Sequence, residues 1–380
     1  MRRFIAFLLV LLLGACAHPT ARLPHEGLQN DYAIQKARRK LYKSSLQYSR
    51  EMEQRIGSVH YNLMKSTGEE LCNRKLKAGT GITFTRSGRK TTNNRYQYAF
   101  WDKRDYADDY NTLHQNSFDN IYIHTIFKGS AADKAGLKPG DRLISCYGVP
   151  APSGKDALDD LERIMKTHGN ALLPVEMTIE RNGKELEFVF EPDRICPYEL
   201  VIDRTTHDVN AFADGEKIYV TIELVDYMDD DTALAGVLAH ELAHSTLGHR
   251  RDKEHNGLIG GLIGFAADIF AGTAENTEKM YGLGAGAYSQ EYELEADYLS
   301  VYYLYRAGYD ITKAPNVQRL LSQRDSSSLY REPTTHPTPQ KRYVLLEDTI
   351  EEIKLKEAFG EDIFPNFNEP NTYLKDKKDY

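Results

Sequence analysis

The chain has 380 residues, of which 41% are hydrophobic, and it carries a formal net charge of −8. This length and apolar content suffice for two to three domains with packed cores. The acidic balance and the absence of a basic stripe argue against nucleic-acid binding. The glycine-rich stretch from Gly257 to Gly264 lacks the lysine and the preceding strand of a phosphate-binding loop, which excludes a nucleotide-binding enzyme of that class.

The first residues have the organisation of an export signal. A short basic start precedes an apolar run, Phe4 to Leu13, which is too short to span a membrane as a stable helix. The run ends in Leu-Gly-Ala-Cys at Cys16, which resembles a bacterial lipobox. We therefore expect a signal peptide over residues 1–15 and a tether over residues 16–30. Several acyl chains on Cys16 would anchor the protein to a membrane.

The residue after the expected lipidation site is Ala17 rather than aspartate. This favours the periplasmic face of the bacterial outer membrane over the inner membrane. The alternative is an ordinary cleaved signal peptide in which Cys16 is incidental.

Residues 31–76 are expected to form an N-terminal helical segment. Apolar residues recur loosely at helical spacing between Asp31 and Ser66. The pattern fits either a helix pair that packs onto the protein or an arm that binds a partner, and it favours packing.

Residues 77–196 have the pattern of a small β-rich domain. Strands are expected at Gly79 to Phe84 and near Ile121, and a hairpin is expected about Asn182-Gly183. The stretch from Gly129 to Ile144, GSAADKAGLKPGDRLI, closely resembles the core of a PDZ domain. Such domains commonly add a ligand's C-terminus to their sheet as an extra strand. The resemblance therefore implies peptide capture; the alternative is a scaffold that covers an active-site cleft.

The four cysteines fit an oxidising compartment. If Cys16 is lipidated, Cys72, Cys146 and Cys196 remain. Cys146 falls in an expected strand and should be buried, whereas Cys72 and Cys196 flank the PDZ-like region. A sequence does not fix cysteine pairing. We nevertheless predict a disulfide between Cys72 and Cys196, because it would join the two ends of that region.

The main chemical motif is Ala239-His240-Glu241-Leu242-Ala243-His244, which reads H-E-x-x-H. Two histidines four residues apart on a helix stand on the same face, so both imidazoles can reach one metal ion. Zinc suits imidazole and carboxylate ligands. Glu241 lies beside the first histidine, where it could take a proton from a metal-bound water.

A second predicted helix, Tyr288 to Arg306, offers the third ligand. Glu293 and Asp297 are four residues apart on it, so one carboxylate could bind the metal. The other could accept the spare N–H of a ligand histidine. His249 lies five residues after His244, whereas a metzincin places its third histidine six residues after the second. We therefore interpret His249 as a non-ligand.

The two helices together resemble those of the gluzincin metalloproteases related to HtpX and the CAAX prenyl proteases. The pattern of that family is H-E-x-x-H followed by E-x-x-A-D, which Glu293-Leu294-Glu295-Ala296-Asp297 matches. The resemblance implies that Glu293 is the third zinc ligand and that Asp297 orients a ligand histidine. It also implies that Ile218 to Ile222 is an edge strand that pairs with substrate. The protease domain would occupy residues 197–360.

Thr335-His336-Pro337 with Arg342 resembles a late H-P element of the same family. His336 and Arg342 thereby join Glu241 as catalytic candidates. His336 could polarise the substrate carbonyl, bind zinc as a fourth ligand that holds the enzyme off, or simply satisfy a loop. Arg342 could pair with an acidic residue beside the metal. The segment from Arg342 to Ala358 is expected to be helical, and residues 361–380 are expected to be a disordered tail.

The sequence thus predicts an α+β chain. A mainly helical zincin-type metalloprotease domain with a small edge sheet follows a PDZ-like domain and an N-terminal helical segment. The predicted function is that of a zinc metalloendopeptidase with one Zn²⁺ per chain, which cleaves misfolded or misassembled envelope proteins. The alternative is a periplasmic chaperone or assembly factor for outer-membrane proteins with a latent zinc site. A purely structural lipoprotein would require the metal motifs to be accidental.

Overall fold

The computed structural model describes residues 31–86, 120–154, 156–169, 172–252, 254–255, 258, 289–330 and 337–367. The chain divides into two units, Met1–Gln47 and Tyr48–Tyr380, and the sheets and the metal cluster lie in the second. The expected combination of helices and sheets is confirmed. None of the helices in the described ranges is long and apolar enough to cross a membrane. The expected signal peptide, Cys16 and the tether lie outside the described residues.

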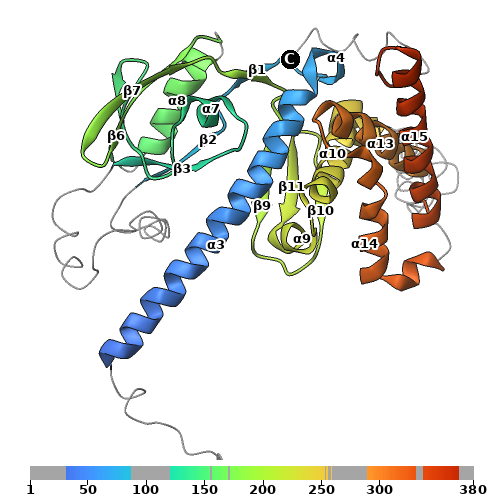
Figure 1. The fold of residues 1–380 in the computed structure, drawn as a ribbon, viewed down its shortest axis with the longest axis horizontal. Coiled ribbons are helices and arrows are strands. Elements are labelled where there is room, and N and C mark those ends of the chain that lie inside the picture. The colour runs from blue at the N-terminus through green and yellow to red at the C-terminus, as the bar shows by residue number, and fades with distance from the viewer. Residues whose placement is uncertain are drawn as a thin grey trace, which may run out of the picture. The chain divides into compact units, whose positions relative to one another are not determined.

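A six-stranded sheet forms the first body of the second unit, with the strand order β2-β3-β4-β6-β7 and with β5 paired to β4. The helix α8 lies against this sheet (Figure 1). The predicted hairpin is confirmed, since β6 and β7 meet at Asn182 and Gly183, which both have positive φ. The elements are β2 (Ile82–Arg86), β3 (Ile121–Ile126), α7 (Ala131–Ala135), β4 (Arg142–Cys146), β5 (Val149–Pro150), α8 (Ala157–Gly169), β6 (Val175–Arg181) and β7 (Lys184–Phe190).

The loop that leads into β2 is held tightly by a glycine. Gly81 has a φ of +74°, and a Cβ atom there would lie 2.2 Å from the Cβ of Ser130. The carbonyl of Thr80 accepts a hydrogen bond from the amide of Ala132. The start of β2 is therefore fixed against the N-terminus of α7.

A separate hydrophobic core joins the second half of α3 to the helical body. The expected helix pair at the N-terminus is instead one continuous helix, α3 (Asp31–Ser66). Figure 1 shows α10, α13 and α15 side by side. The elements of this body are α4 (Gly68–Leu71), β9 (Glu199–Asp203), β10 (Ala211–Ala213), β11 (Lys217–Thr221), α9 (Ile222–Tyr227), α10 (Asp231–Leu247), α13 (Ser289–Arg306), η1 (Ile311–Lys313), α14 (Asn316–Arg324), η2 (Ser326–Leu329) and α15 (Pro339–Phe359).

The prediction of an edge strand at Ile218 to Ile222 is wrong. These residues form β11 and the start of α9, and β11 is the middle strand of the order β10-β11-β9. It pairs antiparallel with β10 and parallel with β9. The outer strand of this small sheet on the α10 side is β10, which contacts α10.

The expectation of a disordered tail is wrong for residues 361–367. Ile363, Phe364 and Phe367 pack against the helical core. The buried Lys356 donates from Nζ to the carbonyl of Phe364 at 2.6 Å, and the Asn366 side chain donates to Glu352 at 2.9 Å. Burial of these apolar side chains and the need of the buried Lys356 ammonium group for hydrogen-bond acceptors keep this segment packed on the core. Residues 368–380 lie outside the described ranges.

A disulfide bond joins Cys72 and Cys196, whose Cα atoms are 5.7 Å apart. Immediately inside it, β1 (Lys77–Gly79) pairs antiparallel with β8 (Asp193–Ile195). The bond and this short ladder together close the ends of the segment that holds the six-stranded sheet. A cross-link over 124 residues stabilises the fold by about 4–5 kcal/mol in the chain-entropy model. Cys146 is free and buried in β4, as expected.

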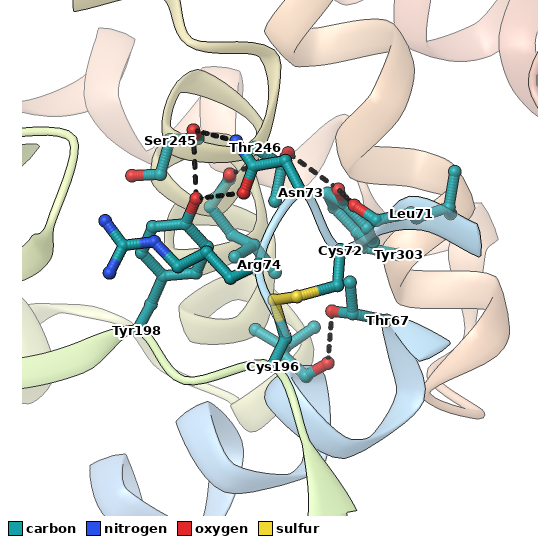
Figure 2. The surroundings of a disulfide bond; sticks show 12 residues. Thr67, Leu71, Cys72, Asn73, Arg74, Cys196, Tyr198, Ser245, Thr246 and Tyr303 are labelled. Atoms are coloured by element: carbon teal, nitrogen blue, oxygen red, sulfur yellow. Dashed lines mark hydrogen bonds between the residues drawn. A yellow bond between two sulfur atoms is a disulfide. The ribbon is translucent and has the colours of Figure 1, made fainter. Parts of the chain in front are cut away.

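The disulfide is also tied to the last turn of α10 (Figure 2). The Tyr198 hydroxyl lies 2.6 Å from Oδ1 of Asn73 and 3.1 Å from the carbonyl oxygen of Ser245. The Asn73 amide donates to the same Ser245 carbonyl at 3.2 Å. The last turn of α10 is therefore hydrogen-bonded to residues that lie next to the two cysteines of the disulfide.

His60, on α3, is a buried histidine near this junction. Its side chain is 8% exposed, and its Nε2 has no hydrogen-bond partner among the described residues. Burial lowers the pKa of His60 to about 4, with a smaller opposing contribution from a backbone hydrogen bond with Tyr198. The neutral ring is thus the form that the fold accommodates.

We expect His60 to make the metal-free protein acid-sensitive. Because the pKa of His60 is lower in the folded than in the unfolded chain, protonation of this ring favours unfolding. The contribution of the neutral ring to the free energy of unfolding is complete above about pH 6.5 and is lost as the pH falls towards 4. The loss should reach about 3 kcal/mol at most. Urea unfolding at pH 7 and pH 4.5 checks this, with the disulfide intact. His60→Gln should lose less stability between the two pH values than the parent; an equal loss in both proteins would contradict the assignment.

Candidate metal centre

The helix α10 positions the two histidines of the H-E-x-x-H motif. Its N-cap is Asp230, whose carboxylate accepts a hydrogen bond from the amide of Ala233 at 2.8 Å. It ends at Gly248, which has a left-handed φ of 75° and donates back to the carbonyls of His244 and Ser245. An acidic N-cap and a terminal glycine therefore set the two ends of this helix.

The third member of the cluster comes from α13, which packs against α10. His240, His244 and Glu293 together form a group in which one ligand atom from each lies within 4.8 Å of the others. The Nε2 atoms of the two histidines are 3.1 Å apart. The Glu293 oxygens lie 3.4 Å from Nε2 of His240 and 3.5 Å from Nε2 of His244.

These distances fit a small tetrahedral cation. Zinc–nitrogen bonds of about 2.0–2.1 Å in a tetrahedron place neighbouring ligand atoms about 3.3 Å apart. Two imidazole nitrogens and a carboxylate are also the donor set that zinc accepts. The residues present therefore fit a zinc ion.

The Nδ1 side of the His240 ring contacts a carboxylate that is paired with an arginine. Its Nδ1 lies 2.9 Å from Oδ1 of Asp297. Arg342, on α15, donates from Nε to Oδ2 of Asp297 at 2.6 Å and from its terminal nitrogen to Oδ1 at 2.7 Å. All three side chains are mostly withdrawn from solvent. Arg342, expected among the catalytic residues, thus contacts the carboxylate behind a histidine.

The charges in this group favour an ionised Asp297. Burial alone would raise the pKa of Asp297, but the Arg342 guanidinium and the His240 ring outweigh it, so the pKa lies below its usual range. A carboxylate is an acceptor only. The Nδ1–H of His240 can therefore point to Asp297, which leaves the Nε2 lone pair facing His244 and Glu293.

Glu241 lies on α10 beside these residues. Burial is the main cause that raises the pKa of its carboxyl group above the usual value, and Glu293 adds to it. A backbone hydrogen bond from Ala213, at the end of β10, works in the opposite direction. A carboxyl group with a raised pKa is better suited to accept and return a proton near neutral pH.

One contact in this group was not anticipated from the sequence. His249 lies 2.9 Å from the Nδ1 of His244, from Nδ1 to Nδ1, although its spacing excludes a metzincin-type ligand. The sequence offered only the position of this histidine, immediately after Gly248. His336 lies outside the described residues, so its three interpretations stay open.

The comparisons with known proteins agree with this geometry. Residues 174–350 match the model of peptidase family M48. The match covers both helices that carry the cluster. Together with the three-residue site, it supports a metallopeptidase domain of that family in this part of the chain.

Two similar proteins are proteases by name. The beta-barrel assembly-enhancing protease of Escherichia coli O157:H7 is 33% identical over 152 residues, which cover 36% of this chain and 31% of that protein. The mitochondrial metalloendopeptidase OMA1 of Arabidopsis thaliana is 31% identical over 140 residues, covering 36% of this chain and 29% of that protein. The chain therefore matches about a third of the length of these relatives.

The solved structures that are similar to part of the chain include that of a PDZ domain. The crystal structure of the HtrA3 PDZ domain bound to a phage-derived ligand covers 32% of this chain and 88% of that chain, with 15% sequence identity and a TM-score of 0.22. At this TM-score the likeness carries no argument about the fold or the ligand.

We expect Asp297→Asn to weaken zinc binding by about 10- to 100-fold, because the amide no longer holds His240 and Arg342 as the carboxylate does. Competition with a chromophoric chelator measures the affinity. The substitution also leaves a buried cation without its counter-charge, so the metal-free protein should lose about 3 kcal/mol of stability. Asp348→Asn, at an exposed position of α15, is the matched control. Equal zinc affinity in the two variants would contradict the role of Asp297.

Proposed function

We propose that the chain is a zinc-dependent endopeptidase whose metal is held by His240, His244 and Glu293. The observation that carries this proposal is the convergence of the three donor groups at distances of 3.1, 3.4 and 3.5 Å. Two imidazole nitrogens and a carboxylate that face one another at these distances are a donor set that one zinc ion can bind. The match to a metallopeptidase family over the same residues supports the assignment.

The bound zinc would supply a Lewis acid that lowers the pKa of a water molecule and polarises the scissile carbonyl. The chain's own residues supply the proton transfers and the alignment. Glu241 accepts the water proton and returns it to the leaving amine, and its raised pKa suits both steps. Asp297 orients His240, and Arg342 orients Asp297 through its paired hydrogen bonds.

The substrate backbone would align on β10 rather than on β11. β10 is an outer strand of its sheet in the described part of the chain, and its Ala213 contributes a backbone hydrogen bond to Glu241. An extended peptide added to this strand would run past the general base. Phe212, which is 51% exposed and stacks on Tyr219, offers an apolar contact beside it.

The six-stranded body would capture peptides as a PDZ-like domain. A groove of about 340 Å³ lies between the helix α8 and β2, which is an outer strand of its sheet among the described residues. Its lining is mainly apolar and includes Ile82, Phe84, Leu158, Leu161 and Met165. An edge strand beside an apolar groove suits a peptide that adds as a strand and buries its last side chain.

The proposed setting is the bacterial envelope. The expected export signal and lipidated Cys16, the disulfide and the relation to a beta-barrel assembly-enhancing protease support an enzyme anchored to the outer membrane. Its substrates would be misfolded or misassembled envelope proteins. The name of that relative also favours the second candidate, an assembly factor whose zinc site is latent.

We expect Glu241→Gln to keep one zinc per chain and to lose hydrolysis of an unfolded protein by about a hundredfold or more, because the amide cannot accept a proton. Elemental analysis and a cleavage assay measure the two properties. Glu291→Gln, at an exposed position of α13, should keep both. Cleavage retained by Glu241→Gln would remove Glu241 from the mechanism. In cells, rescue by the same variant would favour the assembly factor.

We expect Met165→Glu to weaken binding of a fluorescent peptide with an apolar C-terminal residue by about tenfold or more. The new carboxylate would place a charge among the apolar side chains that line the groove. Fluorescence polarisation measures the binding, and Thr167→Glu, which places the same charge at an exposed position of α8, is the control. An equal effect of the two substitutions, or equally tight binding to the parent by the C-terminally amidated peptide, would contradict C-terminal capture in this groove.

A further inference from the structure

A line of contacts also lies behind His244, and it ends in a carboxylate. The Nδ1 atoms of His244 and His249 are 2.9 Å apart. The other ring nitrogen of His249, Nε2, lies 3.1 Å from Oε2 of Glu295. The order along this line is therefore His244, His249 and Glu295.

The position of His249 is fixed from two sides. It follows Gly248, whose left-handed conformation ends α10 and turns the chain back. Its ring is 2% exposed and stacks on Tyr292, with ring centroids 4.5 Å apart and an angle of 18° between the planes. Tyr292 and Glu295 are both on α13, the helix that also carries Glu293. The ring is thus held between the two helices that form the metal centre.

Hydrogen-bond chemistry then assigns the protons. When Nε2 of His244 gives its lone pair to a metal, Nδ1 of the neutral ring carries the hydrogen. That hydrogen points to Nδ1 of His249, which must accept it. The neutral His249 ring then carries its own hydrogen on Nε2, where Glu295 accepts it. Each proton in the line has one donor and one acceptor.

We propose that His249 is a positioning residue for the metal centre, fixing the tautomer and the ring plane of His244, and that Glu295 fixes the tautomer of His249. This inference rests on the proposed function and adds to it. His240 and His244 would each be held from behind by a hydrogen-bond acceptor, a carboxylate for His240 and an imidazole for His244. Acceptors of this kind orient metal-ligating histidines and raise their basicity.

The alternative is that His249 only fills space between the helices. Two substitutions separate these roles. His249→Phe keeps the ring, the burial and the stack on Tyr292 but removes the acceptor. His249→Asn loses the stack, but its side-chain oxygen lies where Nδ1 lies in histidine and can accept from His244. A packing role predicts that phenylalanine is the better replacement, whereas a positioning role predicts asparagine.

The test is the zinc affinity of the full chain, measured by competition with a chromophoric chelator. We expect His249→Phe to bind zinc about 10- to 100-fold more weakly than the parent and His249→Asn to recover most of the loss. His255→Phe makes the same chemical change at an exposed histidine and should bind zinc as the parent does. The melting temperatures of the metal-free variants report separately on packing.

Zinc affinity of His249→Phe within twofold of the parent would overturn the positioning role, as would an asparagine variant weaker than the phenylalanine variant. If His249→Phe does not fold, Glu295→Leu decides, because Glu295 is half-exposed. It should weaken zinc binding about threefold or more, and unchanged affinity would overturn the proposal. If the parent protein binds no zinc, the proposed function itself is contradicted. This result is therefore distinct from one that contradicts only the positioning role of His249.

Discussion

The packing of α10 against α13 is the constraint on which the metal centre depends. Neither helix carries a complete site: α10 brings two imidazoles, and α13 brings the carboxylate that faces them. The interface is formed by buried apolar residues of the larger core, so hydrophobic burial sets the distance between the ligand groups. Figure 1 shows α15 beside α13, and α15 delivers Arg342 to the rear of the site.

Burial makes the charges of this site interdependent. Asp297 and Arg342 are both removed from water, and each would be costly to bury alone. Their pairing keeps Asp297 ionised, and the ionised carboxylate orients His240. For Glu241 the largest influence is burial rather than a neighbouring cation, and burial raises the pKa of its carboxyl group. Two carboxyl groups on neighbouring helices thereby acquire opposite tendencies, one to stay charged and one to exchange a proton.

Local spacing was enough to predict the parts of the site that lie on single helices. The four-residue interval between His240 and His244 needs only helical geometry to place both side chains on one face. Likewise, the Asn182-Gly183 turn predicted the hairpin. These features depend on neighbours in sequence, and the structure has them where they were expected.

Three features that depend on distant contacts were not predicted. β11 is a middle strand because β9 pairs with it in parallel from a segment fourteen or more residues earlier in the chain, which no local pattern encodes. The packed tail depends on Lys356 finding acceptors at Phe364 and Asn366. The contact between His249 and His244 depends on a left-handed turn that returns the chain towards α13. Each of these is decided by tertiary packing.

The zinc content of the purified protein tests most directly whether the cluster is a metal centre. We expect one zinc per chain by elemental analysis after removal of free metal. We expect almost none in a variant with both His240→Ala and His244→Ala, whose metal-free fold remains intact by circular dichroism. Zinc absent from the parent, or equal in the two proteins, would contradict the assignment of the cluster as a metal centre.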